Sequence, residues 1–211
     1  MATFAEMQTD ISERLLDPSN TAVSVANVAA SINEAIGYWK FRRFWFNTAS
    51  DSDTLTAQDP IIPLPDDFLV ELPMNAGFVI EYNDMRYPLI KKNPREYDEV
   101  YLANGYGLPT IYTLKAGVYY CYYLPDQAYT VRRWYLKTYD DLVDDSDTND
   151  FTDNAANMLI YWALSKLYAE LRQDDKMEAY YSARALDEYN NLQVRSEKAN
   201  STGHLTIHSF L

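Results

Sequence analysis

The sequence contains a single cysteine, two histidines and six glycines among 211 residues. One thiol cannot form an internal disulfide, so the fold does not depend on an oxidising compartment. No apolar run reaches the roughly 18 residues that a membrane-spanning helix needs. The first residues also lack the basic and then apolar pattern of a secretion signal. We therefore expect a soluble protein that has no membrane partner and is not exported by that route.

Side chains that could perform catalysis are also scarce. Both histidines, His204 and His208, lie near the C-terminus with no third metal ligand beside them. Cys121 lies within VYYCYYL, where a packed strand residue is a better interpretation than a nucleophile. GYG at 105–107 lacks the rest of a dinucleotide fingerprint, and the sequence has no phosphate-binding loop. The sequence thus predicts a protein that is not an enzyme and has no catalytic residues, cofactor or metal.

Positive charge is in deficit. Lys and Arg together number 18 against 31 Asp and Glu, which gives a net charge of −13. General nucleic-acid binders show the opposite sign, because binding to phosphates requires cations. Seven aspartates lie between Asp140 and Asp153 with no Lys or Arg among them. Just over half of the net charge is therefore concentrated in one short connection.

The stretch DDSDTND within this connection resembles the start of a calcium-binding EF-hand loop. Asp145, Asp147 and Asn149 match the first, third and fifth positions of such a loop. The sixth position requires Gly and the twelfth a bidentate Glu, but the sequence has Asp150 and Ala156 there. The match to a calcium loop is therefore incomplete.

Tyrosine is the residue type in excess, with 19 copies. Its large apolar body and polar tip are typical of surface that becomes half-buried against another molecule, so the excess favours assembly. Tyr and Trp in a β-rich region with acids nearby also leave an alternative function open. That alternative is a carbohydrate-binding or glycan-processing accessory module.

Helical periodicity dominates both ends of the chain. In residues 1–48, the capping-box pair Thr3 and Glu6 precedes a first helix, and a second is expected from about Thr21. In residues 150–200, NAANMLIYWALSKLYAEL is apolar nearly all round, which predicts a helix buried on several sides. A partner helix follows, opened by the capping-box pair Asp175 and Glu178. Each end is thus expected to form a helical hairpin.

Residues 49–149 contain short β-type segments instead. ND at 83–84 predicts a two-residue hairpin turn, and PREYDEVYLANGYG at 94–107 predicts a short helix. The runs TIYTLK, VYYCYYL and YTVRRWYLKTY predict a three-stranded meander. The expected fold class is therefore α+β, with the N- and C-terminal helical hairpins forming a helical bundle and an antiparallel β region inserted between them. Residues 201–211 are expected to be an extended docking tail.

Several stretches occur in a distinctive order along residues 4–195. WKFRRFWF precedes PLPDDF at 63–68, then comes GLPTIYTLKAGVYYCYYLPDQAYTVRRWYLKTYDDL, then the helices LIYWALSKLYAEL and YYSARALDEY. The spacing is marked by Gly107, Pro109, Tyr112, Gly117, Pro125, Tyr129, Tyr135 and Tyr139. This order resembles the head-to-tail adaptor, or connector, proteins of tailed bacteriophages, especially those of short-tailed phages.

The resemblance implies a structural virion protein of the neck, or head-tail junction, made in the cytoplasm of the host bacterium. Copies of such a protein form a ring, commonly of twelve, beneath the portal protein and above the tail or nozzle proteins. The ring prolongs the DNA channel, and the genome passes through it without specific binding. The scarcity of catalytic groups and the many tyrosines agree with this role.

The C-terminal tail is the first candidate site. After Gly203, apolar and polar residues alternate from Leu205 to His208, a pattern that suits a strand added to the exposed edge of another sheet. The portal is the first choice of partner and an adjacent subunit the second, and an unstructured end is the remaining alternative. The expected docking residues are Leu205, Ile207, Phe210 and Leu211.

The acidic connection is the second candidate site, with three interpretations. The favoured one is a solvated connection into the following helix, with Asp150 or Thr152 as the N-cap. In a ring, its carboxylates could instead face the channel and repel the DNA backbone. The third interpretation is a cation site. The residues concerned are Asp144, Asp145, Asp147 and Asp150.

Overall fold

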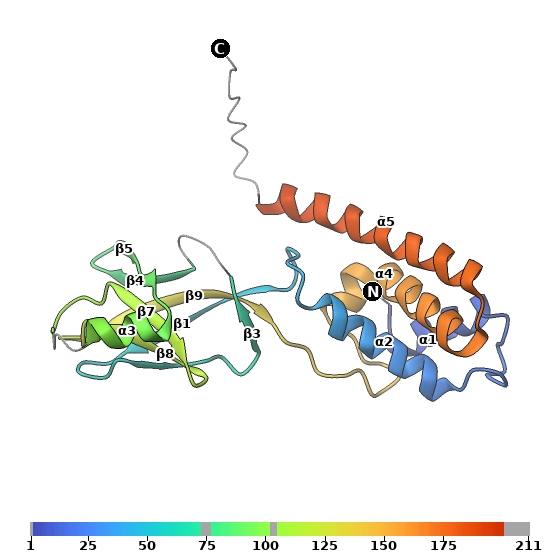
Figure 1. Ribbon diagram of the computed structural model, residues 1–211, viewed down its shortest axis with the longest axis horizontal. Helices are drawn as coiled ribbons and strands as arrows, with labels where there is room; N and C mark the ends of the chain where they lie inside the picture. The colour runs from blue at the N-terminus through green and yellow to red at the C-terminus, as the bar shows by residue number, and fades with distance from the viewer. Residues whose placement is uncertain (1, 73–76, 102–104, 201–211) are drawn as a thin grey trace, which may run out of the picture. The chain divides into compact units, whose positions relative to one another are not determined.

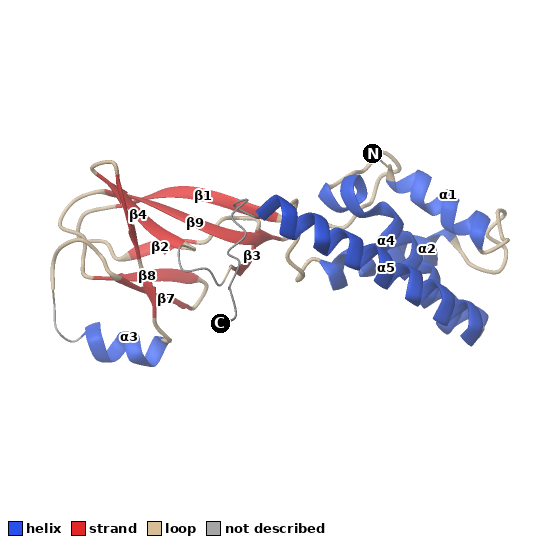
Figure 2. Cartoon of the chain, turned by 90° about the horizontal axis from the view of Figure 1, so that it is seen from above, coloured by secondary structure: helices blue, strands red, loops and turns tan. Residues whose placement is uncertain are grey.

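The computed structural model describes residues 2–72, 77–101 and 105–200 (Figure 1). These residues form helices and two β-sheets, which confirms the predicted α+β class. The chain divides into two compact units. We call them the helical unit, Met1–Asn47 with Tyr139–Leu211, and the β unit, Thr48–Thr138. All the strands that the structure describes belong to the β unit (Figure 2).

The helical unit is built from segments at both ends of the sequence. Its elements are α1 (Phe4–Arg14), α2 (Val25–Trp39), α4 (Asp150–Leu167), a π-helical turn (Tyr168–Arg172) and α5 (Asp175–Asn200). The predicted capping box opens α1: Thr3 Oγ1 accepts from Glu6 N at 3.2 Å, and Glu6 Oε2 accepts from Thr3 N at 2.9 Å. Two otherwise unsatisfied backbone donors are thereby paired.

The second helix begins later than the predicted Thr21. The carboxylate of Asp17 accepts hydrogen bonds from the backbone N–H groups of residues 21–23 at 2.8–3.0 Å. These bonds hold the three residues in a turn, which the apolar periodicity alone does not show. The helix therefore begins at Val25, with Ser24 as its N-cap.

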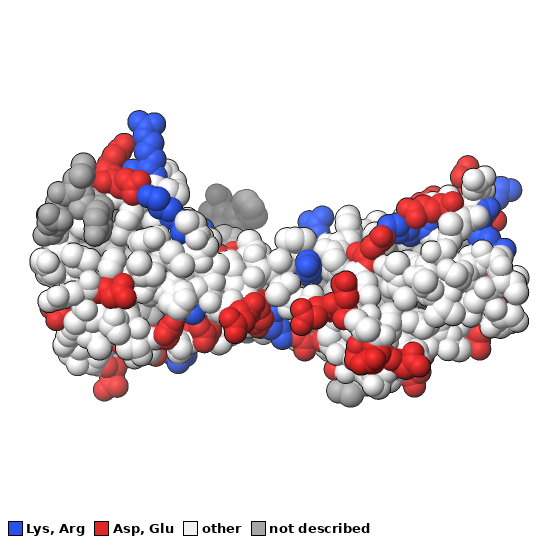
Figure 3. Space-filling view, turned by 90° about the horizontal axis from the view of Figure 1, so that it is seen from below, with Lys and Arg blue, Asp and Glu red and all other residues white. Residues whose placement is uncertain are grey.

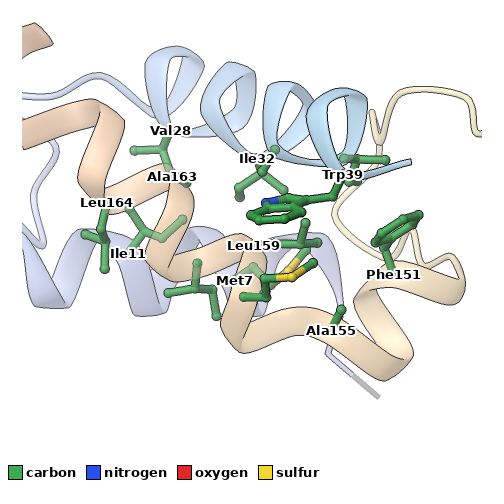
Figure 4. Packing of buried hydrophobic residues seen from close by; sticks show 14 of the residues in the cluster. Met7, Ile11, Val28, Ile32, Trp39, Phe151, Ala155, Leu159, Ala163 and Leu164 are labelled. Carbon is green, nitrogen blue, oxygen red and sulfur yellow. The ribbon is translucent and has the colours of Figure 1, made fainter. Parts of the chain in front are cut away.

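The helix α4 is the centre of the helical unit and packs against α1, α2 and α5. Figure 4 shows Leu159 of α4 close to Met7 of α1 and Trp39 of α2, with Ile32 beside them. Met7, Ile32 and Leu159 are fully buried. The prediction that this segment is a helix buried on several sides is confirmed, since neighbouring helices of the same chain supply the contacts.

The β unit contains two sheets. The first has the strand order β1 (Thr48–Leu55), β9 (Tyr129–Lys137), β4 (Phe78–Tyr82) and β5 (Met85–Pro88), with β3 (Phe68–Glu71) also paired to β9. The second has the order β2 (Ile61–Pro63), β8 (Val118–Tyr122), β7 (Ile111–Lys115) and β6 (Ile90–Lys91). Side chains from both sheets meet in one apolar core that includes Leu55, Ile80, Val131, Ile62, Tyr119 and Cys121.

Two local predictions for this unit are confirmed. The turn at Asn83 and Asp84 joins β4 to β5, with φ values of 50° and 60° at these two residues, as a two-residue hairpin requires. The short helix predicted from Pro94 is α3 (Pro94–Tyr101). Both signals are local in sequence, which is why periodicity and turn chemistry suffice to find them.

The prediction of a three-stranded meander is wrong. Strands β7 and β8 do pair, but β9 lies in the other sheet, between β1 on one side and β3 and β4 on the other. The alternation of apolar residues identifies a strand without identifying its partner, because every pairing of suitable register buries the same face. The region is also not wholly antiparallel, since β6 and β7 are parallel.

Candidate functional site

The acidic loop, residues 140–150, combines exposed and engaged carboxylates. Asp144 and Asp145 are exposed, whereas Asp147 and Asp150 are half-buried. Asp147 Oδ2 accepts hydrogen bonds from Val143 N at 2.7 Å and Asp144 N at 2.8 Å. These two backbone donors lower the pKa of the Asp147 carboxyl, because they stabilise its charged form. Asp147 therefore shapes the loop, whereas Asp144 and Asp145 are exposed to solvent.

The backbone of the same loop caps the start of α1. Phe4 N donates to Asp147 O and Ala5 N donates to Asp145 O, both at 3.1 Å. The first N–H groups of a helix have no partner inside it, so these carbonyls satisfy donors that would otherwise be unpaired. The loop thus has a fixed backbone that presents Asp144 and Asp145 outward.

A further anchor lies on the other side of the loop. Asn33 Oδ1 accepts from Leu142 N at 2.9 Å, and Asn33 Nδ2 donates to Leu142 O at 3.0 Å. Leu142 is also buried in the core of the helical unit. Contacts to α1 and α2 therefore hold the loop at both ends of its acidic stretch.

The prediction that Asp150 or Thr152 is the N-cap of α4 is wrong. Asn149 is the cap, and its Oδ1 accepts from Phe151 N at 2.9 Å and Thr152 N at 3.1 Å. Thr152 Oγ1 in turn accepts from Asn149 N at 2.9 Å, which completes a capping box. Asp150 has a different role, because its Oδ2 accepts from Tyr139 Oη at 2.9 Å.

These hydrogen bonds occupy oxygens that a calcium loop would need. Of the three residues that match the EF-hand pattern, Asp147 and Asn149 already use a side-chain oxygen to bind two backbone N–H groups each. Across residues 2–72, 77–101 and 105–200, no group of three or more His, Cys, Asp or Glu side chains is placed to hold a metal ion. The structure thus offers no support for the cation-site interpretation.

Charge on the rest of the surface has the same sign as the loop. The space-filling view shows acidic side chains spread over the face drawn, with fewer basic ones between them (Figure 3).

Arg132 and Arg133, which lie next to each other in an aromatic strand, do not form a basic groove. Arg133 is buried with its Nη2 at 2.6 Å from Asp51 Oδ2, and Arg132 pairs with Glu81 at 3.5 Å.

The β unit shows no sign of a nucleophile at its cysteine. Cys121 is fully buried, and burial raises the pKa of its thiol to about 12. The thiolate, which is the reactive form, is therefore disfavoured at neutral pH. Tyr112, Tyr119, Tyr129 and Tyr135, which belong to the aromatic runs behind the carbohydrate-binding alternative, are also buried. They pack the core of the unit and offer no exposed platform.

An aromatic groove in the helical unit was missed by the sequence analysis. Both α2 and α5 pack against α4, which lies between them (Figure 1), and an open cavity of about 520 Å³ remains along their sides. We call it the α2–α5 groove. It is lined by Tyr38, Trp39, Trp162, Glu178, Ala179, Ser182, Ala183, Ala185 and Leu186.

Large and small side chains lie on opposite walls of this groove. Tyr38 and Trp162 stack with ring centroids 5.6 Å apart, and Tyr38 is 52% exposed. The wall formed by α5 carries Ala179, Ser182 and Ala183, whose short side chains keep the groove open. Their spacing of three and four residues was the available signal, but a groove formed by three helices cannot be deduced from one of them.

The predicted docking residues Leu205, Ile207, Phe210 and Leu211 lie outside the described residues, as do both histidines. Within the part of the chain that the structure describes, no helix is long and apolar enough to cross a membrane. The candidate sites among the described residues are thus the acidic loop and the α2–α5 groove.

One protein family matches the chain over both units. A family model described as SU10 adaptor protein matches residues 2–206. No curated protein matches the chain. The family match extends over the helical ends and the β region alike, so it concerns the whole architecture and not one motif.

Proposed function

This chain belongs to the SU10 adaptor protein family and has the structural role of a phage head-to-tail adaptor, and from that premise we propose that its copies form a ring of about twelve beneath the portal. The ring extends the DNA channel and provides the attachment platform for tail or nozzle proteins. The observation that carries the proposal is the family match over residues 2–206.

The domain organisation is part of the same proposal. We interpret the helical unit as a bundle of two hairpins, α1 with α2 and α4 with α5, and the β region as an insertion between them. The shared core of residues from α1, α2, α4 and α5 supports this interpretation. Such a unit is held together by one continuous core, which suits a rigid building block for a ring.

The acidic loop is proposed to face the channel. Asp144 and Asp145 are exposed on a backbone fixed by hydrogen bonds to Phe4, Ala5 and Asn33. Symmetry would repeat these charges in every subunit, and like charge repels the phosphate backbone. A channel lined in this way lets the genome pass without binding it, because binding requires cationic neutralisation.

The C-terminal tail is proposed to dock the ring onto the portal, with an adjacent subunit as the second choice. Its apolar residues Leu205, Ile207, Phe210 and Leu211 follow α5 in the sequence, and α5 ends at Asn200. An extended strand that adds to a sheet edge gains backbone hydrogen bonds, and alternate side chains fix its register.

Reconstitution with the portal tests the proposed function. We expect the purified chain mixed with portal rings to produce a complex whose mass, measured by native mass spectrometry, corresponds to one added ring. Deletion of residues 203–211 should leave a folded protein that no longer joins the portal, because the docking residues are removed. The matched control replaces the same residues with a Gly/Ser segment of equal length. A full-length protein that never associates with portal would contradict the adaptor role at this position, and a truncated one that assembles normally would contradict tail docking alone.

A further inference from the structure

The α2–α5 groove presents an apolar surface that no described segment of the chain covers. Tyr38 and Leu186 on its walls are 52% and 54% exposed, and Trp162 is half-buried. Leaving such aromatic and aliphatic surface in water is unfavourable, so a groove of this kind is typical of a binding site. We propose that its occupant in the free subunit is the C-terminal tail of the same chain, folded back along α5.

The length of the tail matches the position of the groove. If residues 201–203 reverse the chain direction, residues 204–211 span about 26 Å at about 3.3 Å per residue when extended. The same distance along α5, at about 1.5 Å per residue, covers about 17 residues back from Asn200. This places Phe210 and Leu211 between Leu186 and Ala183, within the lining of the groove. Gly203 lies where the reversal is needed, and glycine is the residue that turns most easily.

The chemistry of the two partners also matches. The wall formed by α5 has short side chains at Ala179, Ser182 and Ala183, which leave room for a bulky ring such as that of Phe210. The opposite wall offers the aromatic faces of Tyr38 and Trp162, and aromatic rings pack well against one another. A strongly charged segment would find no matching charge here, since Glu178 is the single ionisable carboxylate or cation in the lining.

Storage of the tail in the groove would control assembly. This consequence rests on the proposed function, in which the same apolar residues dock the subunit onto its partner. Side chains held in the groove cannot at the same time bind another chain, so docking requires their release. A free subunit would then keep its adhesive segment covered until a partner that binds it more strongly displaces it from the groove.

Cross-linking in the isolated protein tests the position of the tail. The reporter variant carries Ser182→Cys, in the groove, with Ser209→Cys, in the tail. Its matched control carries Arg184→Cys with Ser209→Cys. Arg184 lies two residues further along α5, is exposed and is not part of the lining. Cys121 does not interfere, because it is fully buried.

A short bismaleimide should join the two thiols of the reporter within one monomer, at a yield about tenfold above that of the control, because tethering in the groove raises their effective concentration. The linked monomer is recognised by its faster migration on a denaturing gel. Adding Phe210→Asp and Leu211→Asp to the reporter should reduce the yield to the control level.

Equal cross-linking yields in the reporter and the control would overturn the proposal. A reporter whose yield is unchanged by Phe210→Asp and Leu211→Asp would also overturn it. Cross-linked dimers in place of monomers would also overturn it, since the occupant would then be the tail of a second copy. The experiment contains no portal, so its failure leaves the adaptor function standing. Conversely, a subunit that fails to join portal can still give the predicted cross-link.

Discussion

At the scale of single residues, Asp17 organises the turn between α1 and α2. Its Oδ1 accepts from Thr21 N at 3.0 Å and Thr21 Oγ1 at 2.8 Å, and its Oδ2 accepts from Ala22 N at 2.9 Å and Val23 N at 2.8 Å. These bonds, led by the one from Val23 N, lower the pKa of the Asp17 carboxyl. Four donors directed at one carboxylate explain why this turn replaces the first residues of the predicted helix.

The substitution Asp17→Asn should lower the melting temperature by about 5 °C, because the amide cannot accept all four hydrogen bonds. The folded-state pKa lies below the unfolded value of about 3.9, so the folded state binds fewer protons. The stabilisation is therefore complete above about pH 5 and is lost as the pH falls through 3.9 toward the folded pKa. Thermal denaturation between pH 2 and pH 7 should show the wild-type advantage shrink on the acid side.

The control for this prediction is Glu99→Gln, which removes an exposed ion pair of 3.4 Å with Arg95. Exposed pairs of this kind contribute little, so the melting temperature should change by about 1 °C. If the difference in melting temperature between the wild type and Asp17→Asn does not vary with pH, the charge of Asp17 does not stabilise the turn.

Helix caps mark the limit of what single residues predict. The box at Thr3 and Glu6 is found as expected, because no other capping residue lies close by. At α5, the spacing of Asp175 and Glu178 predicts a cap at Asp175, yet Asp174 Oδ1 accepts from Lys176 N and Met177 N at 3.1 Å. Where several acceptors are adjacent, the path of the preceding chain decides which one faces the helix amides, and sequence alone does not contain that path.

At the scale of elements, the sequence predicts which segments form helices or strands, but it does not predict which of these segments pack or pair with one another. Helical and strand segments follow from hydrophobic spacing, and the hairpin at Asn83 and Asp84 follows from turn chemistry. The sheet assignment of β9 and the α2–α5 groove both depend on contacts between segments far apart in the chain. Trp162 illustrates the difference, since its apolar context indicates a core position but α2 and α5 leave one side of it open.

This contrast gives a prediction for α4. Leu159→Ala should reduce the free energy of unfolding by about 3 kcal/mol, because the side chain is fully buried and its removal leaves a cavity. Trp162→Ala should cost only about 1–2 kcal/mol, because the half-buried ring loses less apolar contact. Denaturant titration measures both values.

As a reference for α4, Val194→Ala on the exposed side of α5 should change the free energy of unfolding by less than about 0.5 kcal/mol. If Trp162→Ala proves as costly as Leu159→Ala, then Trp162 is a core residue and the groove is closed in solution.

At the scale of the whole molecule, the acidic residues can be divided into those that stabilise the fold and those that are exposed to solvent. The chain has a net charge of −13, and seven of its aspartates lie between Asp140 and Asp153. Within this stretch, Asp147 and Asp150 bind partners inside the chain, whereas Asp144 and Asp145 are exposed. The first pair therefore belongs to the fold, and the second pair is available for an effect on DNA.

The double substitution of Asp144→Asn and Asp145→Asn should leave the fold intact, because α1 is capped by the carbonyl groups of this loop and not by these two side chains. Its control, Asp187→Asn with Glu197→Gln, removes the same two charges from exposed positions on α5. If the loop faces the channel, virions with the loop variant should eject DNA a few-fold more slowly than virions with the control. The difference should be largest at low salt, since the screening length falls from about 30 Å at 0.01 M to about 8 Å at 0.15 M ionic strength. Ejection followed by dye fluorescence in purified particles measures this rate, and equal rates for the two variants at every salt concentration would leave the loop with its structural role alone.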